Sequence, residues 1–190
     1  LLTMMGIPYI EAYGEGEAQA AYLVENGDAW AVASQDYDCL LFGAKRVVRN
    51  LAINSNLGDL EYYNLKRVLD ELDINREQLI DMGILIGTDF SEGLKGVGAK
   101  TALKLAKKGE LENKLAKLQE ESSHDISEVR EIFLNHNVNT DYKIRWKKPA
   151  KNDIIDFLCE EHGFSQDRVS KACDKLKNLN SSQKSLEDWF

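Results

Sequence analysis

Short apolar runs alternate with helical segments over the first half of the chain. AWAVAS (29–34) and KRVVRNLAI (45–53) have the composition of buried strands, and PYIEA (8–12) has that of a shorter one. EAQAAYLVENG (17–27) has the apolar spacing of a helix and ends at Gly27. Strands separated by helices form βαβ units. The pattern therefore predicts an α/β fold with a parallel-rich sheet flanked by helices.

The second half of the chain has an almost wholly helical pattern. Asn64 and Asn75 are expected to cap the two helices that lead into it. Beyond Asp89, apolar positions recur with helical spacing in the segments 101–109, 111–119, 126–136, 152–163 and 169–179. The stretch HNVNTDYKIRWKKPAKN is expected to be an irregular connector. We predict one folded region over 1–177, mostly helical from about residue 89, and a flexible tail over 178–190.

The composition is that of an ordinary globular protein, with 43% hydrophobic and 29% charged residues in a chain of 190. No apolar run approaches the roughly 20 residues that cross a bilayer, and no secretory signal is evident. These features indicate a cytoplasmic or nuclear protein with no membrane partner. Cys39, Cys159 and Cys173 are widely spaced and odd in number, which argues against a disulfide framework. Cys159 and His162 lie three apart, but no second pair completes a zinc site.

Five carboxylates stand where apolar elements end or helices begin. Glu15 and Glu17, Asp36 and Asp38, and Asp89 follow the runs MGIPYI, AWAVAS and MGILIG. A buried strand delivers the residues after it to the sheet edge, where open α/β sheets bind ligands. Mg²⁺ prefers oxygen ligands and uses few carboxylates per ion, so five acids indicate more than one ion. Two such ions can stabilise the attacking and leaving oxygens of a phosphodiester, which makes phosphate-ester hydrolysis the leading hypothesis.

Other interpretations of these acids stay open. The chain has 32 acidic residues, so either pair alone could be a solvated surface feature. Glu15 and Glu17 would point to one side on extended backbone, but they would diverge if the helix has already begun. Gly14 and Gly16 do not make a dinucleotide-binding loop, because the third Gly is missing and the acids would repel a pyrophosphate. A nucleotide-binding α/β protein is therefore disfavoured.

A glycine-containing turn in SEGLKGVGAKTALKL is the second candidate site. Gly96 and Gly98 can adopt positive φ, and the helix that follows starts with unpaired N–H groups. Backbone amides there can approach a phosphate closely, and Lys100 adds charge, so the turn could bind a DNA backbone without sequence preference. An ordinary turn between two helices is the alternative.

The net charge of −8 does not exclude nucleic-acid binding, because a local basic patch can supply it. The candidate basic residues are Lys95, Lys100, Lys104, Lys107 and Lys108 in one group, and Arg145, Lys147 and Lys148 in another. Either group could equally be a solvated face.

The polar tail NLNSSQKSLEDWF ends in two aromatic residues and forms the third candidate site. Gln183, Leu186, Trp189 and Phe190 have no core of their own in which to be buried. Exposed aromatics at a disordered terminus are typical of a docking peptide that folds on its partner.

Taken together, these segments resemble the archaeal and eukaryotic flap endonuclease family, within the broader XPG/Rad2 nucleases. The resemblance runs from MGIPYIEA through EGEAQAAYLV, SQDYDCLLFG, LIGTDF and GLKGVGAKTAL to CEEHGFS and QKSLEDWF. It implies a PIN-like nuclease core and Mg²⁺- or Mn²⁺-dependent cleavage of branched DNA that carries a 5′ flap. It also implies 5′–3′ exonuclease activity, in DNA replication and repair.

The resemblance assigns roles to particular residues. The family's metal ligands match Glu15, Glu17, Asp36, Asp38 and Asp89. Its helix–two-turn–helix element, which holds K⁺ against the duplex backbone, matches Gly93–Thr101, with the backbone carbonyls of Leu94 and Val97 as ion ligands. Its peptide for the DNA sliding clamp, proliferating cell nuclear antigen, matches Gln183, Leu186, Trp189 and Phe190.

The chain departs from the family pattern in two loops and at its start. Tyr13, Gly14 and Gly16 replace the usual Pro-Ser and Ala around the first Glu, and Ala99 and Thr101 replace a Pro and a basic residue after the glycine turn. The chain opens at LLTMMG, without the N-terminal nuclease domain that supplies two further aspartates, catalytic Lys and Arg residues and the helical arch. We therefore expect part of a composite active site, inactive or nearly so by itself. The alternative is a non-catalytic module that bridges duplex DNA and the clamp.

Overall fold

The computed structural model describes residues 1–51 and 59–179, with side chains up to residue 176. The chain divides into two compact units. One unit is continuous, from Ala12 to Val138, and the other combines Leu1–Glu11 with the chain from Asn139 onward. The bounds predicted from the sequence, one folded region over 1–177 and a tail over 178–190, stay a prediction.

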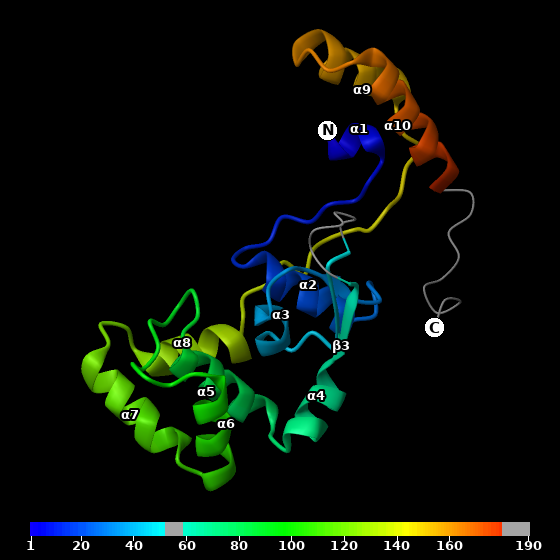
Figure 1. Cartoon of the computed structure of the whole chain (residues 1–190). Coiled ribbons are helices and arrows are strands. Elements are labelled where there is room, and N and C mark those ends of the chain that lie inside the picture. The colour runs from blue at the N-terminus through cyan, green and yellow to red at the C-terminus, as the bar shows by residue number, and fades with distance from the viewer. Residues whose placement is uncertain (52–58, 180–190) are drawn as a thin grey trace. The chain divides into compact units, whose positions relative to one another are not determined.

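A three-stranded sheet lies in the continuous unit, in the order β1-β2-β3. Its edge strand β3 is labelled in Figure 1. β1 (Val32–Ala33) runs parallel to β2 (Arg46–Arg49), and β2 runs antiparallel to β3 (Glu61–Asn64). The α/β prediction is confirmed, but the sheet is mixed rather than largely parallel. The reason is the short connection between β2 and β3, since a parallel pair needs a crossover of about a dozen residues or more, usually with a helix.

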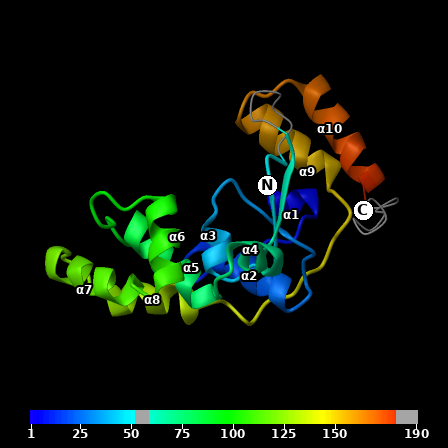
Figure 2. The same cartoon turned by 60° about the horizontal axis from the view of Figure 1, so that its bottom comes forward.

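Helices cover this sheet and then form a layer of their own. α2 (Gly16–Glu25), α3 (Asp38–Leu41) and α4 (Leu65–Leu72) belong to the sheet region. α5 (Arg76–Ile86) packs against α6 (Ala99–Lys108), α7 (Leu111–Glu121) and α8 (Ile126–Leu134) (Figures 1 and 2). The helices predicted over 101–109, 111–119 and 126–136 are therefore confirmed.

Two asparagine caps fix where α4 and α5 begin. Asn64 Oδ1 accepts a hydrogen bond from the Arg67 N–H at 3.1 Å. Asn75 Oδ1 accepts one from the Gln78 N–H at 2.8 Å, and the Gln78 side chain in turn accepts the Asn75 N–H at 2.9 Å. This reciprocal arrangement is a capping box, which satisfies two N–H groups that a helix start leaves unpaired. Both predicted caps are confirmed.

An aromatic group joins α3, α5 and α8 in the core of the continuous unit. Phe133, Ile80, Ile84 and Leu85 are fully buried. The ring of Phe133 lies 5.0 Å from that of Phe42, measured between centroids. It lies 5.6 Å from the ring of Phe90, edge to face. The core therefore extends to the turn after α5, where Phe90 directly follows Asp89.

The second unit contains α1 (Leu2–Met5), α9 (Lys151–Ile155), the π-helical segment η1 (Asp156–Glu161) and α10 (Gln166–Leu179). The helix expected over 152–163 therefore forms as α9 followed by η1. The connector 136–150 has no regular structure, as predicted. Cys39, Cys159 and Cys173 are free thiols. None of the helices described has the length and apolar character that a membrane crossing requires.

The strand predicted at PYIEA does not form. Pro8 has no N–H to donate to a sheet. The chain just before it bonds instead to the connector, with the Lys147 N–H donating to the Gly6 carbonyl at 2.9 Å and the Ala150 N–H to that of Met4 at 2.8 Å. The predicted strand 45–53 forms as β2, and its end beyond residue 51 lies outside the described residues, as does the tail from residue 180.

Candidate metal centre

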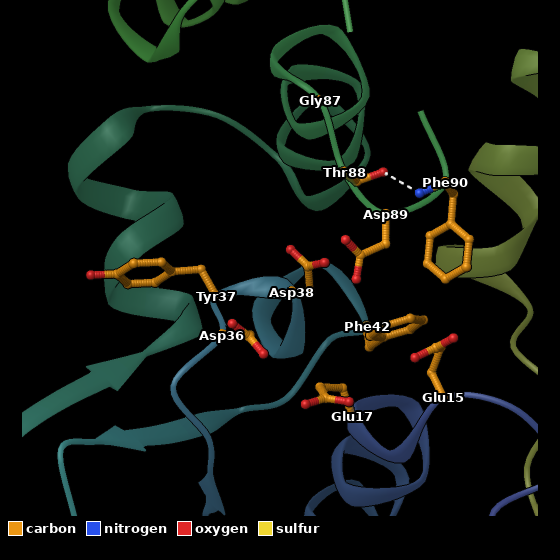
Figure 3. Close-up of a pocket in the computed structure, with 10 residues that line it drawn as sticks. All are labelled: Glu15, Glu17, Asp36, Tyr37, Asp38, Phe42, Gly87, Thr88, Asp89 and Phe90. Atoms are coloured by element: carbon orange, nitrogen blue, oxygen red, sulfur yellow. Dashed lines mark hydrogen bonds between the residues drawn. The ribbon is translucent and has the colours of Figure 1, made fainter. Parts of the chain in front are cut away.

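All five of the carboxylates singled out in the sequence line one pocket of about 470 Å³ in the continuous unit (Figure 3). The remaining lining residues are Tyr37, Phe42, Gly87, Thr88 and Phe90. No Lys, Arg or His is among the lining residues. The carboxylates come from three separate segments: the start of α2, the β1–α3 connection and the turn after α5.

The start of α2 determines how its two acids are presented. The helix begins at Gly16, with Glu15 as its N-cap residue on extended backbone and Glu17 in its first turn. The backbone is therefore extended at Glu15 and already helical at Glu17, which is neither of the two cases that the sequence left open, and both side chains line the pocket. The Ser34 hydroxyl, just after β1, donates a hydrogen bond to Glu17 Oε1 at 3.2 Å and accepts one from the Asp36 N–H at 3.2 Å. Ser34, which the sequence analysis did not single out, thus connects two of the acidic segments.

A tight turn after α5 presents Asp89 at its exposed tip. The Thr88 N–H donates to the Ser91 carbonyl at 2.8 Å, and the Ser91 N–H donates to the Thr88 carbonyl at 3.2 Å. The turn is anchored in the core because the buried Ser91 hydroxyl donates to the Ile84 carbonyl at 3.1 Å. Asp89 points from this turn toward the space that it shares with Asp38 (Figure 3).

Asp38, the first residue of the short helix α3, carries the clearest electrostatic signature of the pocket. Burial raises the pKa of its carboxyl group above the ordinary 3.8, and the negative charges of the other four acids raise it further: Asp89, Asp36, Glu17 and Glu15. Bringing these groups together without a counter-ion costs free energy. A cation in the pocket would remove that cost.

This cost predicts that Asp38→Asn stabilises the metal-free protein at pH 7. Because the folded-state pKa of Asp38 lies above 3.8, the native state holds this proton to higher pH than the unfolded chain does. The stabilisation that this carboxyl group contributes at low pH is therefore lost as the pH rises from 3.8 through the pKa of Asp38 in the folded protein. We expect the variant to gain about 1 kcal/mol at pH 7, because the site is partly screened by solvent. Thermal unfolding in a chelator from pH 4 to 8 is the measurement, and a lower melting temperature for the variant at pH 7 would contradict it.

The donor set fits a hard divalent cation. Within residues 1–51 and 59–179, however, no three Asp, Glu, His or Cys side chains are arranged so that they could hold a metal ion as they stand. The acids surround a common space rather than forming a closed cage. This spacing suits Mg²⁺, which keeps several waters and takes only one or two carboxylates directly.

The glycine turn between α5 and α6 combines one closely packed glycine with two open ones. Gly93 and Gly96 have positive φ, at 71° and 83°. An added Cβ at Gly93 would lie 2.6 Å from the Ile86 carbonyl oxygen, whereas at Gly96 or Gly98 it would meet nothing within 4 Å. α6 begins after Gly98 with no side-chain cap, and Lys100 in its first turn is exposed. The turn is thus built tightly at Gly93 and is open at Gly96 and Gly98.

The two carbonyls that the family resemblance assigns to K⁺ differ in their bonding. Leu94 is buried, and its carbonyl accepts the Val97 N–H at 3.0 Å. Among the described residues, no backbone N–H donates to the Val97 carbonyl. Neutral carbonyl oxygens of this kind are suitable ligands for a monovalent cation, although the Leu94 oxygen would be shared with its hydrogen bond.

The two basic groups lie in different units of the structure. Lys95, Lys100, Lys104, Lys107 and Lys108 are all exposed on the turn and on α6. Arg145, Lys147 and Lys148 are exposed in the connector of the other unit. The tail residues Gln183, Leu186, Trp189 and Phe190 lie outside the described residues.

Comparison with known proteins identifies the class of protein that this fold and pocket belong to. Residues 6–89, which include all five acids, match the XPG I-region family. A solved structure of flap endonuclease-1 from Methanococcus jannaschii superposes with a TM-score of 0.85 at 43% identity, over 95% of this chain and 56% of that one. Human GEN1 in complex with Holliday junction DNA gives a TM-score of 0.76 at 25% identity, over 97% of this chain and 53% of that one.

Within this class, the chain is similar to the flap endonucleases. It is 55% identical over its whole length to flap endonuclease 1 of Methanothermobacter thermautotrophicus, and 47% identical to that of Archaeoglobus fulgidus. The chain spans 58% and 60% of the length of these relatives, matching their C-terminal part. The family resemblance seen in the sequence is therefore confirmed.

Proposed function

We propose that the chain carries part of the active site of a 5′-flap endonuclease with 5′–3′ exonuclease activity, acting in DNA replication and repair. The observation that carries this proposal is the gathering of Glu15, Glu17, Asp36, Asp38 and Asp89 around one pocket that has no basic residue in its lining. Uncompensated carboxylates of this number are otherwise costly to bring together, as the raised pKa of Asp38 indicates. The similarity to archaeal flap endonucleases supports the choice of substrate.

The five acids would hold two Mg²⁺ or Mn²⁺ ions. Bound there, the ions would stabilise the attacking and leaving oxygens of the scissile phosphodiester. The chain's own groups would keep the acids in place, with Ser34 connecting Glu17 to the Asp36 loop and Ser91 anchoring the turn that carries Asp89. The apolar wall formed by Phe42 and Phe90 would limit water on one side of the pocket.

The turn between α5 and α6 would bind the duplex beside the incision site. Its support is the open backbone at Gly96 and Gly98, the uncapped start of α6 and the exposed Lys100. We propose that K⁺ binds at the Leu94 and Val97 carbonyls against a DNA phosphate. The complex of human GEN1 with Holliday junction DNA supports branched duplex DNA as the ligand class.

Gly98→Ala tests this interface. Gly98 has extended backbone, with φ −107° and ψ 180°, and an added methyl group meets nothing, so the fold should keep its stability. The methyl group would block close approach of a phosphate to the first N–H groups of α6. We expect duplex binding to weaken by about 1 kcal/mol, or roughly fivefold, the usual size of one hydrogen bond. Fluorescence anisotropy with a labelled duplex measures this, and unchanged affinity at unchanged melting temperature would reject the interface.

The tail would recruit the DNA sliding clamp through Gln183, Leu186, Trp189 and Phe190. The support is the sequence pattern alone, an apolar and aromatic ending on a polar segment. Loss of clamp binding on truncation after Leu179, measured by calorimetry, is the test. Since the relatives are archaeal, we place the activity in the cytoplasm.

Incision of a labelled 5′-flap duplex tests the whole proposal. The assay compares this chain with a protein that extends it to the full length of its archaeal relatives, each with Mg²⁺ or with a chelator. We expect incision near the branch by the longer protein with Mg²⁺, binding with little or no cleavage by this chain, and much slower cleavage of an unbranched duplex. If the longer protein binds branched DNA and the clamp but never cleaves, the chain is instead a non-catalytic module that bridges the two.

A further inference from the structure

Tyr37 stands between two acids of the pocket but its ring extends away from them (Figure 3). On the far side it meets the sheet. Its ring packs edge to face against Tyr63 of β3, with 5.5 Å between centroids, and the two hydroxyl groups lie 3.3 Å apart. The side chains of Asp36 and Asp38 therefore lie at the pocket, whereas the Tyr37 ring between them packs against β3.

Arg49, the last residue of β2, holds this loop from two sides. Its Nε donates a hydrogen bond to the Gln35 carbonyl at 2.9 Å, and one terminal nitrogen donates to the Tyr37 hydroxyl. Its guanidinium carbon also lies 3.9 Å from the centroid of the Tyr37 ring. These contacts fall on the residues directly before and directly after Asp36, so one planar group holds the backbone before that acid and the side chain after it.

The strands hold Arg49 in turn. Arg49 forms an ion pair with Glu61 at 2.8 Å, and these two residues are direct partners across β2 and β3. The Tyr63 hydroxyl donates to the same Glu61 oxygen at 3.0 Å. Hydrogen bonds to Tyr37 and then to Glu61 raise the pKa of Tyr63 to about 12. The Arg49 side chain is only 18% exposed, which gives this arrangement more rigidity than a surface ion pair has.

We propose that Arg49 is a positioning residue for the metal centre, which keeps the Asp36–Asp38 loop in place against the repulsion of the other acids. The proposal rests on the assignment of the pocket as a metal site. Without a cation, the five carboxylates that line the pocket repel one another, and a free loop would relieve this repulsion by moving outward. An anchored loop instead presents both aspartates ready for a cation, so less of the binding free energy is lost to ordering.

Mn²⁺ binding to the chain, measured by titration calorimetry, tests this with a readout that is separate from cleavage. Residues that orient metal ligands typically change affinity by about 10- to 100-fold when they are replaced. We expect Arg49→Met to weaken Mn²⁺ binding by about tenfold, with little change in melting temperature. The Mn²⁺ affinity of Arg49→Lys should lie between those of the unmodified chain and of Arg49→Met, because a single ammonium cannot reproduce the planar fork that reaches both Gln35 and Tyr37.

Arg46→Met is the matched control, since Arg46 lies on the same strand and makes the same kinds of contact elsewhere. Its Nε donates to the Trp30 carbonyl, and its guanidinium carbon lies 5.2 Å from the centroid of the Trp30 ring. Removing it should leave Mn²⁺ affinity unchanged. Equal losses in Arg46→Met and Arg49→Met would overturn the proposal, because they would show a general effect of the strand.

Two further variants separate the possible failures. Asp38→Asn should remove most Mn²⁺ binding. If it binds as well as the unmodified chain, the metal assignment itself fails. If Asp38→Asn loses binding while Arg49→Met keeps the full affinity, the pocket is a metal site and the positioning role is wrong. Should Arg49→Met fail to fold, Tyr37→Leu, at a half-exposed position, carries the test, and an affinity equal to the unmodified chain's would overturn the proposal.

Discussion

Asp89→Asn should abolish Mg²⁺-dependent flap incision in a protein that extends this chain to the full length of its relatives, while the fold stays intact. Asp89 is exposed at the tip of its turn, and within the described part of the chain no hydrogen bond or ion pair involves its side chain. Asparagine has the same shape, so the change removes only the charge that faces the pocket. We expect the single-turnover rate to fall on the order of 10³-fold, as when an electrostatic stabiliser of a transition state is lost.

Glu92→Gln is the matched control for this variant. Glu92 is an exposed acid three residues further along the same turn, and it does not line the pocket. Its neutralisation changes the net charge equally and should leave the incision rate within about twofold, since surface substitutions of this kind have small effects. DNA binding by Asp89→Asn should be equal to or tighter than that of the unmodified protein, because one negative charge near the phosphates is gone. Incision by Asp89→Asn at the unmodified rate would exclude Asp89 from the metal centre.

The sequence was sufficient to predict the helical layer because its signals are local. Asn64 and Asn75 cap their helices through side-chain oxygens that reach only three residues ahead, so sequence spacing alone determines the bond. The sheet was predicted less well because its pairing is not local. β3 was not predicted at all, and PYIEA has an apolar strand pattern but bonds to the connector instead of to another strand.

The five acids could be predicted as a group because each follows an apolar run, although only AWAVAS contains a strand, whereas MGILIG ends the helix α5 and PYIEA has no regular structure. The contacts that hold these acids in place could not be predicted from the sequence. Ser34 and Ser91 are short polar residues with no pattern of their own, and their roles depend on partners 17 and 7 residues away. Arg49 contacts Gln35 and Tyr37 only because β2 lies beside β1. A side chain that acts across a sheet leaves no periodic signal in the sequence.

Gly93→Ala should destabilise the fold severely, because the turn between α5 and α6 has no room at this position. Gly93 has φ 71°, and an added Cβ would lie 2.6 Å from the Ile86 carbonyl oxygen, closer than any ordinary contact of such an atom. That oxygen belongs to the backbone at the end of α5 and cannot move without shifting the helix. The strained backbone costs about 1–2 kcal/mol and overpacking about 1–3 kcal/mol more, so we expect a total loss of about 2–5 kcal/mol in urea unfolding.

Gly96→Ala separates the two causes within the same turn. Gly96 has φ 83°, so alanine there meets the same backbone strain, but its Cβ would have no neighbour within 4 Å. We expect a loss of only about 1–2 kcal/mol, which is the conformational cost without the clash. If the two variants lose equal stability, strain rather than space determines the need for glycine. The larger loss at Gly93 would show that this glycine serves the packing of α5 against the turn, which leaves Gly96 and Gly98 as the positions whose open backbone is available for the proposed DNA binding.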